Sequence, residues 1–270
     1  MNPAEFHHLP AQTRRSFVAR LSCWGLFAVA SVPLGAQADL VASIARARLS
    51  VVIVGSFRAT DSPRFRLRGT GFVIADGNLV VTNAHVLPDA SEDTANMSLV
   101  LQLRGSSNEL EMRQATVLEV DKMHDLALLK MSGAPAPAMV VGDSNTVKEG
   151  QSVAFTGFPI GGALGFSPVT HKGMVSSITA ISLPMANAQQ LNAKTIRSLR
   201  DGSFDIFQLD ATAYPGNSGG PLFNPDTGEV LGIVNMTLVK GTKESALTNP
   251  SGISYAIPSR YILELMVRGR

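Results

Sequence analysis

The chain reads Pro215-Gly216-Asn217-Ser218-Gly219-Gly220-Pro221 towards its C-terminal end, and this stretch is its most specific feature. A serine hydroxyl is a weak nucleophile unless a base takes its proton and hydrogen-bond donors hold the oxyanion that forms. Flanking glycines allow unusual backbone dihedrals, so the amides around Ser218 can converge on one point. Taken alone, the stretch also fits a glycine-rich hairpin without chemistry. A nucleophilic role for Ser218 therefore requires a base and an acid elsewhere in the chain.

Four of the five histidines are poor candidates for that base. His7 and His8 lie in a segment that we expect to be removed on export. His171 has no acid close to it in sequence, which is typical of a surface or packing residue. His124 precedes Asp125 on an expected strand, where neighbouring side chains point to opposite faces. These two residues are therefore not expected to be partners.

His85 remains, just past the end of an expected strand, where a loop can present it to a cleft. Asp125 is the best candidate to orient it, because it opens the apolar run 126–130. A carboxylate in that place is costly to bury without a hydrogen-bonding partner. Asp143 and Asp210 are rival acids, but each lies at a turn signal or a strand end, where a capping role is sufficient.

Short runs rich in Val, Ile, Leu and Phe recur between Gly, Asp, Asn and Pro residues, which is typical of consecutive antiparallel strands. Asp76-Gly77, between two of the runs, indicates a tight hairpin. The Pro- and Gly-containing stretch 133–142 divides the runs into two sets and is the expected linker. The expected strands are 50–54, 70–74, 79–82, 98–103, 114–120, 126–131, 152–156, 169–181, 206–210, 221–223, 230–236 and 253–257.

Two sets of about six short strands predict two small closed β units, the first over about residues 50–132 and the second over about 143–258. Helices are expected only at the margins, at 40–49 and at about 259–268. The polar insert 182–204 carries Lys and Arg residues, and an insert of this length is either a regulatory element or a solvated loop.

The composition is that of an ordinary packed protein, with 45% hydrophobic and 16% charged residues among 270. The formal net charge is +2 and neither sign forms a long run, so nothing indicates binding to nucleic acid. The single cysteine, Cys23, excludes an intrachain disulfide and a cysteine-based zinc cluster. The sequence contains no recognisable metal-ligand cluster, and the expected chemistry needs no cofactor.

Residues 1–38 have the three zones of an export signal: a polar start with arginines, an apolar stretch at 21–34 and the small-residue ending Ala36-Gln37-Ala38. The apolar stretch is shorter than the about 20 residues that cross a membrane as a helix. The string Thr13-Arg14-Arg15-Ser16-Phe17-Val18 is typical of a twin-arginine signal; a general secretory signal is the alternative. We expect a periplasmic or secreted protein, no stable membrane insertion after cleavage, and one mature domain over 39–270.

The order His, Asp, Ser with these surroundings resembles the trypsin-like serine peptidases and, within them, the HtrA/Deg group. Five strings carry the resemblance and span nearly all of the mature chain. They are Gly69-Thr70-Gly71-Phe72-Val73-Ile74, Val81-Thr82-Asn83-Ala84-His85-Val86, His124-Asp125-Leu126-Ala127-Leu128-Leu129-Lys130, Gly216-Asn217-Ser218-Gly219-Gly220-Pro221 and Gly252-Ile253-Ser254-Tyr255-Ala256-Ile257-Pro258-Ser259. The resemblance implies an all-β fold of two six-stranded antiparallel barrels, with the active site in the cleft between them.

Carried over by position, the resemblance implies a role for each member of the site. Ser218 is the nucleophile, His85 the general base and then acid, and Asp125 the carboxylate that orients the imidazole. The resemblance also implies an oxyanion hole at Gly216, Asn217 and Ser218, formed by the backbone N–H groups of Gly216 and Ser218.

The sequence also departs from the group. The chain after Ser218 is too short to hold the last strands, the terminal helix and a PDZ module. We therefore expect no PDZ domain and no regulation by a bound C-terminal peptide. Little chain separates Asp39 from the first strand, so a trimer-forming extension is not evident, and both a monomer and a homotrimer are compatible with the sequence.

Substrate preference follows from one position. In trypsin-like enzymes that cut after Lys or Arg, an acid lies six residues before the nucleophile, and that position is Thr212 here. A neutral floor gives a buried cation no partner, so we expect small or medium apolar residues at the cleaved position. By the same resemblance, Asn235, Met236 and Thr237 line another wall of the specificity pocket.

The sequence thus predicts a periplasmic or secreted serine endopeptidase that hydrolyses exported or misfolded polypeptides through an acyl-enzyme. Two alternatives use the same residues. One is a catalytically silent member of the fold that only binds polypeptides. The other is an esterase, because the same triad attacks any activated carbonyl.

Overall fold

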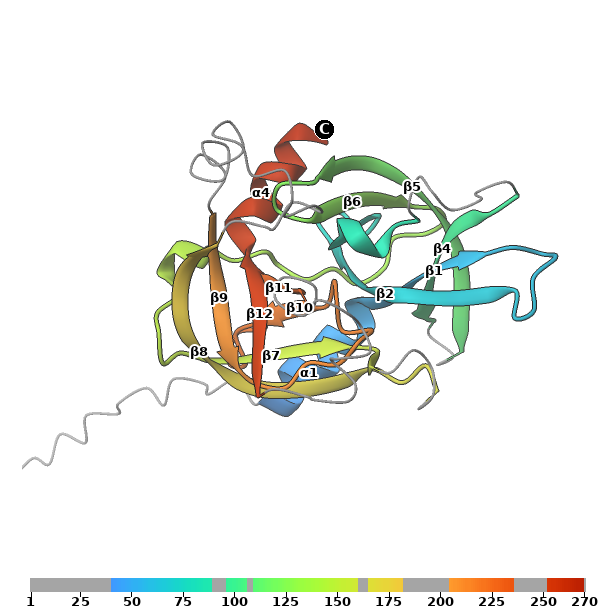
Figure 1. Cartoon of the computed structure of the whole chain (residues 1–270). Helices are drawn as coiled ribbons and strands as arrows, with labels where there is room; N and C mark the ends of the chain where they lie inside the picture. Colours follow the sequence, from blue (N-terminus) through green and yellow to red (C-terminus); the bar gives the residue numbers. More distant parts are fainter. Residues whose placement is uncertain are drawn as a thin grey trace, which may run out of the picture. The chain divides into compact units, whose positions relative to one another are not determined.

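The structure is a computed structural model that describes residues 40–88, 96–105, 109–159, 165–181, 204–235 and 252–269. All of them belong to one compact unit that begins at Gln37. Their strands close into two antiparallel barrels of six strands each (Figure 1). The predicted fold class is confirmed. The expected export signal lies outside the described residues, as does the expected insert 182–204 except for Phe204, which begins a strand.

Barrel one is formed by the first six strands, and its ladder order is β1-β2-β3-β6-β5-β4, with β4 paired back to β1. Its strands are β1 (Val51–Phe57), β2 (Phe65–Ile74), β3 (Leu79–Asn83), β4 (Ser98–Arg104), β5 (Leu110–Asp121) and β6 (Leu126–Met131). The predicted hairpin at Asp76 is present: Gly77 has a φ of 90°, and Asp76 Oδ1 accepts the backbone N–H of Asn78 at 3.1 Å.

Barrel two repeats the same order with the last six strands, β7-β8-β9-β12-β11-β10, and β10 pairs back to β7. Its strands are β7 (Ser152–Gly157), β8 (Val169–Ile181), β9 (Phe204–Asp210), β10 (Pro221–Phe223), β11 (Val230–Asn235) and β12 (Ile253–Pro258). Because the sequence signals are apolar runs with turn residues between them, the existence of these strands was predictable.

The run Val51-Val52-Ile53-Val54 shows why these strands do not alternate between apolar and polar residues. Val52 and Val54 belong to a cluster to which the strands of barrel one contribute, whereas Val51 and Ile53 belong to a second cluster that residues of both barrels share. Both faces of β1 are therefore buried, and a strand buried on both faces reads as a continuous apolar run.

The shared cluster is what joins the two barrels. Its contributors come from both barrels and from the C-terminal helix, and they bury nearly all of their side-chain surface. They include Phe72, Ile74, Leu128, Phe223, Ile233, Ile257, Ile262 and Leu265. Each barrel therefore has its own interior, and this third core fixes the position of one barrel against the other.

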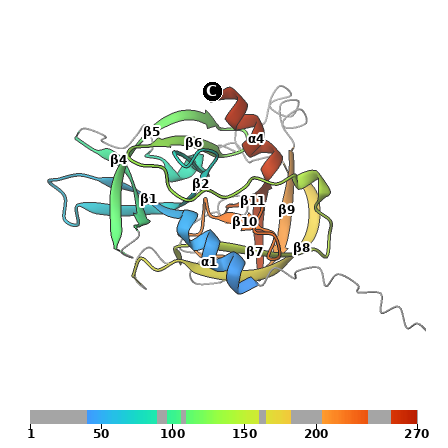
Figure 2. The ribbon, with the colours of Figure 1, turned by 180° about the vertical axis from the view of Figure 1, so that it is seen from behind.

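Two helices flank the barrels, α1 (Leu40–Ser50) and α4 (Ser259–Arg268), where the sequence predicts them. Helix α1 lies behind the strands in Figure 1 and in front of them in the reverse view (Figure 2). Helix α4 contacts β5 and β6 of barrel one as well as β11 and β12 of barrel two. It buries Ile262 and Leu265 and leaves Leu263 41% exposed, as helical spacing requires.

One local prediction was wrong. We expected His124 and Asp125 on a strand, but they lie in a turn over residues 122–125 between β5 and β6. No helix within the described ranges is both long enough and apolar enough to span a bilayer.

Candidate active site

His85 and Asp125 form a close pair on barrel one. His85 lies in η1 (Ala84–Val86), a 3-10 turn directly after β3, and Asp125 is the residue before β6. The ladder pairs Asn83 with Leu126, so the residues just beyond this pair meet. His85 Nδ1 lies 2.6 Å from Asp125 Oδ2, and the His85 backbone N–H donates to Oδ1 at 2.9 Å. Both carboxylate oxygens bind His85, so the imidazole has one orientation, with Nε2 directed away from the acid.

The backbone of Asp125 supports the same arrangement. Its φ is 51°, in the left-handed region that Asp adopts more readily than most residues. Its carbonyl oxygen accepts the backbone N–H of Ala84 at 3.0 Å and the side-chain amide of Asn83 at 3.1 Å. The turn that carries the acid and the turn that carries the histidine are therefore tied together by main chain and side chain.

Asn235 reaches the same carboxylate from barrel two. It is the last residue of β11, has no exposed surface, and donates from Nδ2 to Asp125 Oδ2 at 2.6 Å. The sequence had placed Asn235 in the wall of the specificity pocket; the structure places its amide on the acid. An amide at the end of the fully buried strand β11 needs a partner, and this was the signal that could have indicated its place.

The loop that carries Ser218 is attached to barrel one. The carbonyl oxygen of Ser218 accepts the backbone N–H of Thr70 at 2.8 Å, and Thr70 Oγ1 donates to the Gly216 carbonyl oxygen at 2.6 Å. A Cβ on Gly69 would lie 2.7 Å from a methyl group of Val86 and 2.9 Å from the Ser218 carbonyl oxygen. The serine loop and the histidine turn therefore meet at this part of β2.

Glycines allow the chain around Ser218 to take its path. Gly216 and Gly219 have φ values of 102° and 86°, and a Cβ on Gly219 would lie 2.0 Å from a carbonyl oxygen of β2. The Asn217 carbonyl accepts the N–H of Gly220 at 2.9 Å. In a trans peptide the Ser218 N–H then points the opposite way. No backbone hydrogen bond between described residues uses the Gly216 N–H.

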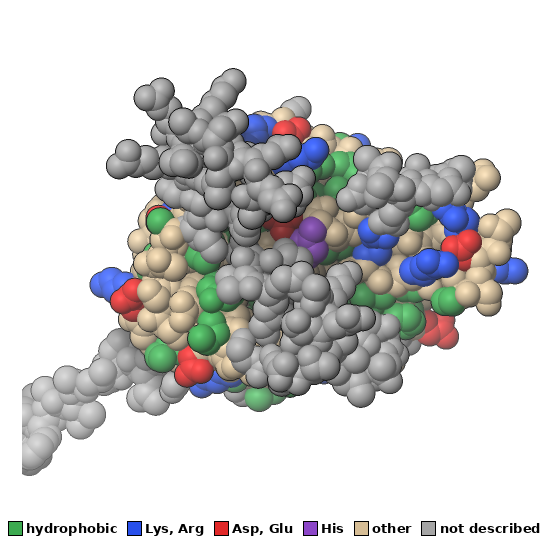
Figure 3. Space-filling model, in the orientation of Figure 1, with side chains coloured by type: hydrophobic (Ala, Val, Ile, Leu, Met, Phe, Trp, Pro, Cys, Tyr) green, Lys and Arg blue, Asp and Glu red, His purple; other side chains and the backbone are tan. Residues whose placement is uncertain are grey.

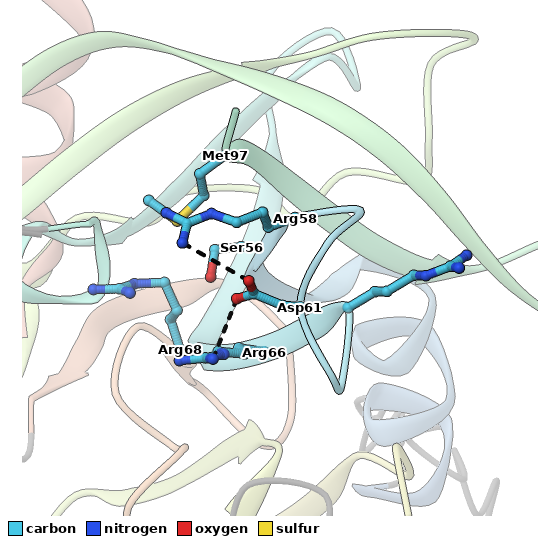
Figure 4. A pocket seen from close by; sticks show the side chains of 7 residues that line it. Ser56, Arg58, Asp61, Arg66, Arg68 and Met97 are labelled. Carbon is cyan, nitrogen blue, oxygen red and sulfur yellow. Dashed lines mark ion pairs between the residues drawn. The ribbon is translucent and has the colours of Figure 1, made fainter. Parts of the chain in front are cut away.

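A small basic cavity lies beside the histidine turn (Figure 4). Asp61 forms ion pairs with Arg58 and Arg66, at 3.8 and 3.2 Å. Arg68 points away from them and donates to the carbonyl oxygens of Val86 and Leu87, at 2.8 and 2.9 Å. The cavity has a volume of about 250 Å³ and is lined by Ser56, Arg58, Asp61, Arg64, Arg66, Arg68 and Met97. Through Arg68, β2 fixes the segment directly after the histidine.

The surface view shows histidine atoms at the surface, with basic side chains to one side of them (Figure 3). Among the histidines described, His85 has a side chain that is 25% exposed, whereas that of His124 is 10% exposed. The described residues contain no group of three or more His, Cys, Asp or Glu side chains that could hold a metal ion.

The expected specificity residues are only partly described. Thr212 is half-buried in the segment after β9, and its neighbours are held by Ser254 of β12. Ser254 Oγ accepts the N–H of Ala213 at 2.8 Å and donates to the carbonyl oxygen of Ala211 at 2.7 Å. Met236 and Thr237 lie outside the described residues.

The residues that we set aside have other partners. His124 pairs with Asp121, at 2.8 Å between Nδ1 and Oδ2. His171 stacks on Phe155 with ring centroids 4.9 Å apart, and burial lowers the pKa of this histidine. Asp143 caps the turn η2 (Ser144–Thr146), which is the capping role that the sequence predicts.

Comparisons with known proteins agree with this arrangement. The model of the family described as "Trypsin-like peptidase domain" matches residues 69–233. Serine protease HTRA3 of Rattus norvegicus is 33% identical over 199 residues, which cover 73% of this chain and 36% of that protein. A probable periplasmic serine endoprotease DegP-like of Halomonas elongata is 34% identical over 193 residues, covering 72% and 33%. The chain thus spans about a third of the length of the curated relatives it matches.

Solved structures resemble the chain over most of its length. An HtrA-type protease AlgW variant with a tripeptide has a TM-score of 0.58 and 25% identity, covering 84% of this chain and 62% of that one. The HtrA-type protease AlgW with a decapeptide has a TM-score of 0.61 at 23% identity, covering 86% and 67%. The latter likeness shows the fold alone.

Replacing Asn235 tests the contact between the barrels. In Asn235→Ala, the buried Asp125 carboxylate loses a hydrogen bond, so we expect the free energy of unfolding to fall by about 1.5–3 kcal/mol. Asn145→Ala is the matched control, because Asn145 also donates to an aspartate, Asp143, at 2.8 Å, but both residues are exposed. Equilibrium unfolding in urea measures both. Equal losses in the two variants would contradict the importance of the buried contact.

Proposed function

The chain belongs to the trypsin-like peptidase family and has HtrA-type relatives, and from this we propose that it is a serine endopeptidase. Ser218, His85 and Asp125 are its catalytic triad, and the backbone amides of Gly216 and Ser218, the residues before and after Asn217 in the chain, form its oxyanion hole. The observation that carries the proposal is the Asp125 carboxylate, which holds His85 through both oxygens beside the loop of Ser218.

The proposed reaction needs only groups of the chain. His85 Nε2 takes the proton of Ser218 Oγ as this oxygen attacks the scissile carbonyl carbon, and the amides of the oxyanion hole stabilise the negative oxygen. The imidazolium, stabilised by Asp125, then donates its proton to the leaving amine, and the acyl group stays on Ser218. Water attacks the acyl-enzyme by the same route, releases the carboxylic acid and restores the serine.

Polypeptides in an exported compartment are the proposed substrates. Three DegP-like relatives are named as probable periplasmic endoproteases, which supports a periplasmic or secreted place for this chain and exported or misfolded proteins as targets. The string around Arg14 and Arg15 supports export through a twin-arginine signal. For its assembly state, both a monomer and a homotrimer remain compatible with the sequence.

The proposed preference is for small or medium apolar residues at the cleaved position. Thr212 and its neighbours Ala211 and Ala213 are uncharged, and Ser254 holds this segment through neutral hydrogen bonds. A lysine or arginine side chain of the substrate would be desolvated there without a counter-charge. This composition supports a neutral pocket around Thr212, whose spacing of six residues before Ser218 is the reason for proposing it as the floor.

Replacing Ser218 tests the proposed function. We expect the wild-type chain to digest casein and to react with a fluorophosphonate probe. In Ser218→Ala both should be lost, with kcat lower by more than about 10⁴-fold, because the nucleophile is gone. Ser176→Ala, at an exposed serine of β8, should match the wild type. A wild-type chain that binds casein but neither cuts it nor reacts with the probe would indicate a silent binding protein. Turnover of short esters without digestion of casein would indicate an esterase.

A peptide library tests the preference. We expect cleavage after Ala, Val or other small and medium apolar residues. In Thr212→Asp, the new carboxylate offers a counter-charge, so the profile should move towards Lys and Arg. Mass spectrometry of the products reads both profiles. A wild-type profile dominated by Lys or Arg would contradict the proposed pocket.

A further inference from the structure

The turn that carries Asp125 contains a second histidine–aspartate pair. Asp121 is the last residue of β5, and its Oδ2 lies 2.8 Å from His124 Nδ1. Its Oδ1 accepts the backbone N–H groups of Met123 and His124, at 3.0 and 3.1 Å. The His124 and Asp121 side chains are 10% and 8% exposed. One buried carboxylate therefore fixes the backbone of the turn up to the residue before Asp125.

Barrel two and its helix cover this pair. Tyr261 of α4 stacks on the His124 ring, with centroids 4.0 Å apart and an interplanar angle of 18°. Phe204, the first residue of β9, meets the same ring edge-on at 4.8 Å. Arg268, at the end of α4, donates to Asp121 Oδ2. The acid-bearing turn of barrel one is thus held by an aromatic stack and an ion pair that come from the other half of the chain.

The charge on Asp121 decides which partner donates the hydrogen bond between Asp121 and His124. Burial alone would raise the pKa of Asp121, but the hydrogen bonds from His124 and Arg268 outweigh burial and hold the pKa below its ordinary value. Asp121 is therefore a carboxylate at neutral pH and accepts only. His124 must then donate from Nδ1, which fixes its ring between the turn and the helix.

We propose that His124 is a positioning residue, which locks the turn to α4 and so keeps the Asp125 carboxylate against His85. Asp125 has a φ of 51°, and a non-glycine residue keeps that conformation only where the surrounding contacts hold it there. If the turn is released, Asp125 can return to ordinary backbone angles, and its carboxylate then leaves the imidazole. The kinetic part of this inference rests on the proposed peptidase function.

Two substitutions of His124 separate the hydrogen bond from the packing. His124→Phe keeps a ring between Tyr261 and Phe204 but cannot donate to Asp121. His124→Asn loses the ring but keeps an N–H close to the place of Nδ1. We expect kcat to fall about 10- to 100-fold in His124→Phe with KM within about twofold, because the acid is misplaced while substrate binding is untouched. His124→Asn should recover most of kcat.

Two arginine variants that leave the core intact form a matched test and control. Arg268→Gln removes the ion pair with Asp121, and we expect it to lower kcat in the same direction as His124→Phe. Arg113→Gln is the control, because it removes a pair with another carboxylate, that of Glu111 at 2.9 Å, near the opposite end of β5 from the turn. Arg113→Gln should keep the wild-type kcat.

A spectroscopic reading keeps this test independent of turnover. Proton NMR of the wild type should show a far-downfield resonance from the proton between His85 Nδ1 and Asp125, assigned by its absence in His85→Ala. It should shift or broaden in His124→Phe and Arg268→Gln, but not in Arg113→Gln. An unchanged resonance with wild-type kcat in His124→Phe would overturn the inference. A wild type that cuts nothing would overturn the proposed function instead, and the resonance alone would then decide the role of His124.

Discussion

The site depends on the hydrogen bonds of one carboxylate. Asp125 Oδ1 and Oδ2 hold the backbone and the imidazole of His85, and Oδ2 also accepts the amide of Asn235 from the other barrel. Asp125 is 9% exposed, and each of these donors satisfies a lone pair of its carboxylate. A buried carboxylate with fewer donors would destabilise the fold. The two barrels therefore meet at this acid, and the orientation of the histidine depends on how they pack.

The packing of the barrels is set by apolar burial rather than by the polar groups. Each barrel fills its own interior, and a third cluster joins strands of both barrels to α4. Backbone contacts of Thr70 with the serine loop and of Asp125 with Ala84 then fix the loops at the seam. Such a division of roles suits chemistry that requires groups placed to within a fraction of an ångström.

Much of this was predictable from the sequence. Apolar runs between turn residues indicate the strands, and Ser218, His85 and Asp125 lie in recognisable sequence motifs. The partners across the barrels were not predictable. Asn235 meets Asp125 across 110 positions, and Tyr261 stacks on His124 from a helix that no local pattern places there. His124 was set aside because we expected it on a strand. The segment forms a turn instead, in which the Asp121 side chain accepts the backbone N–H groups of Met123 and His124.

A crystal structure of the chain after reaction of Ser218 with a fluorophosphonate tests the central claim most directly. The Asp125 carboxylate should still bridge His85 and Asn235, and the phosphoryl oxygen should lie about 2.7–3.1 Å from the amides of Gly216 and Ser218. An unmodified serine, or an imidazole turned away from Asp125 in the adduct, would contradict it.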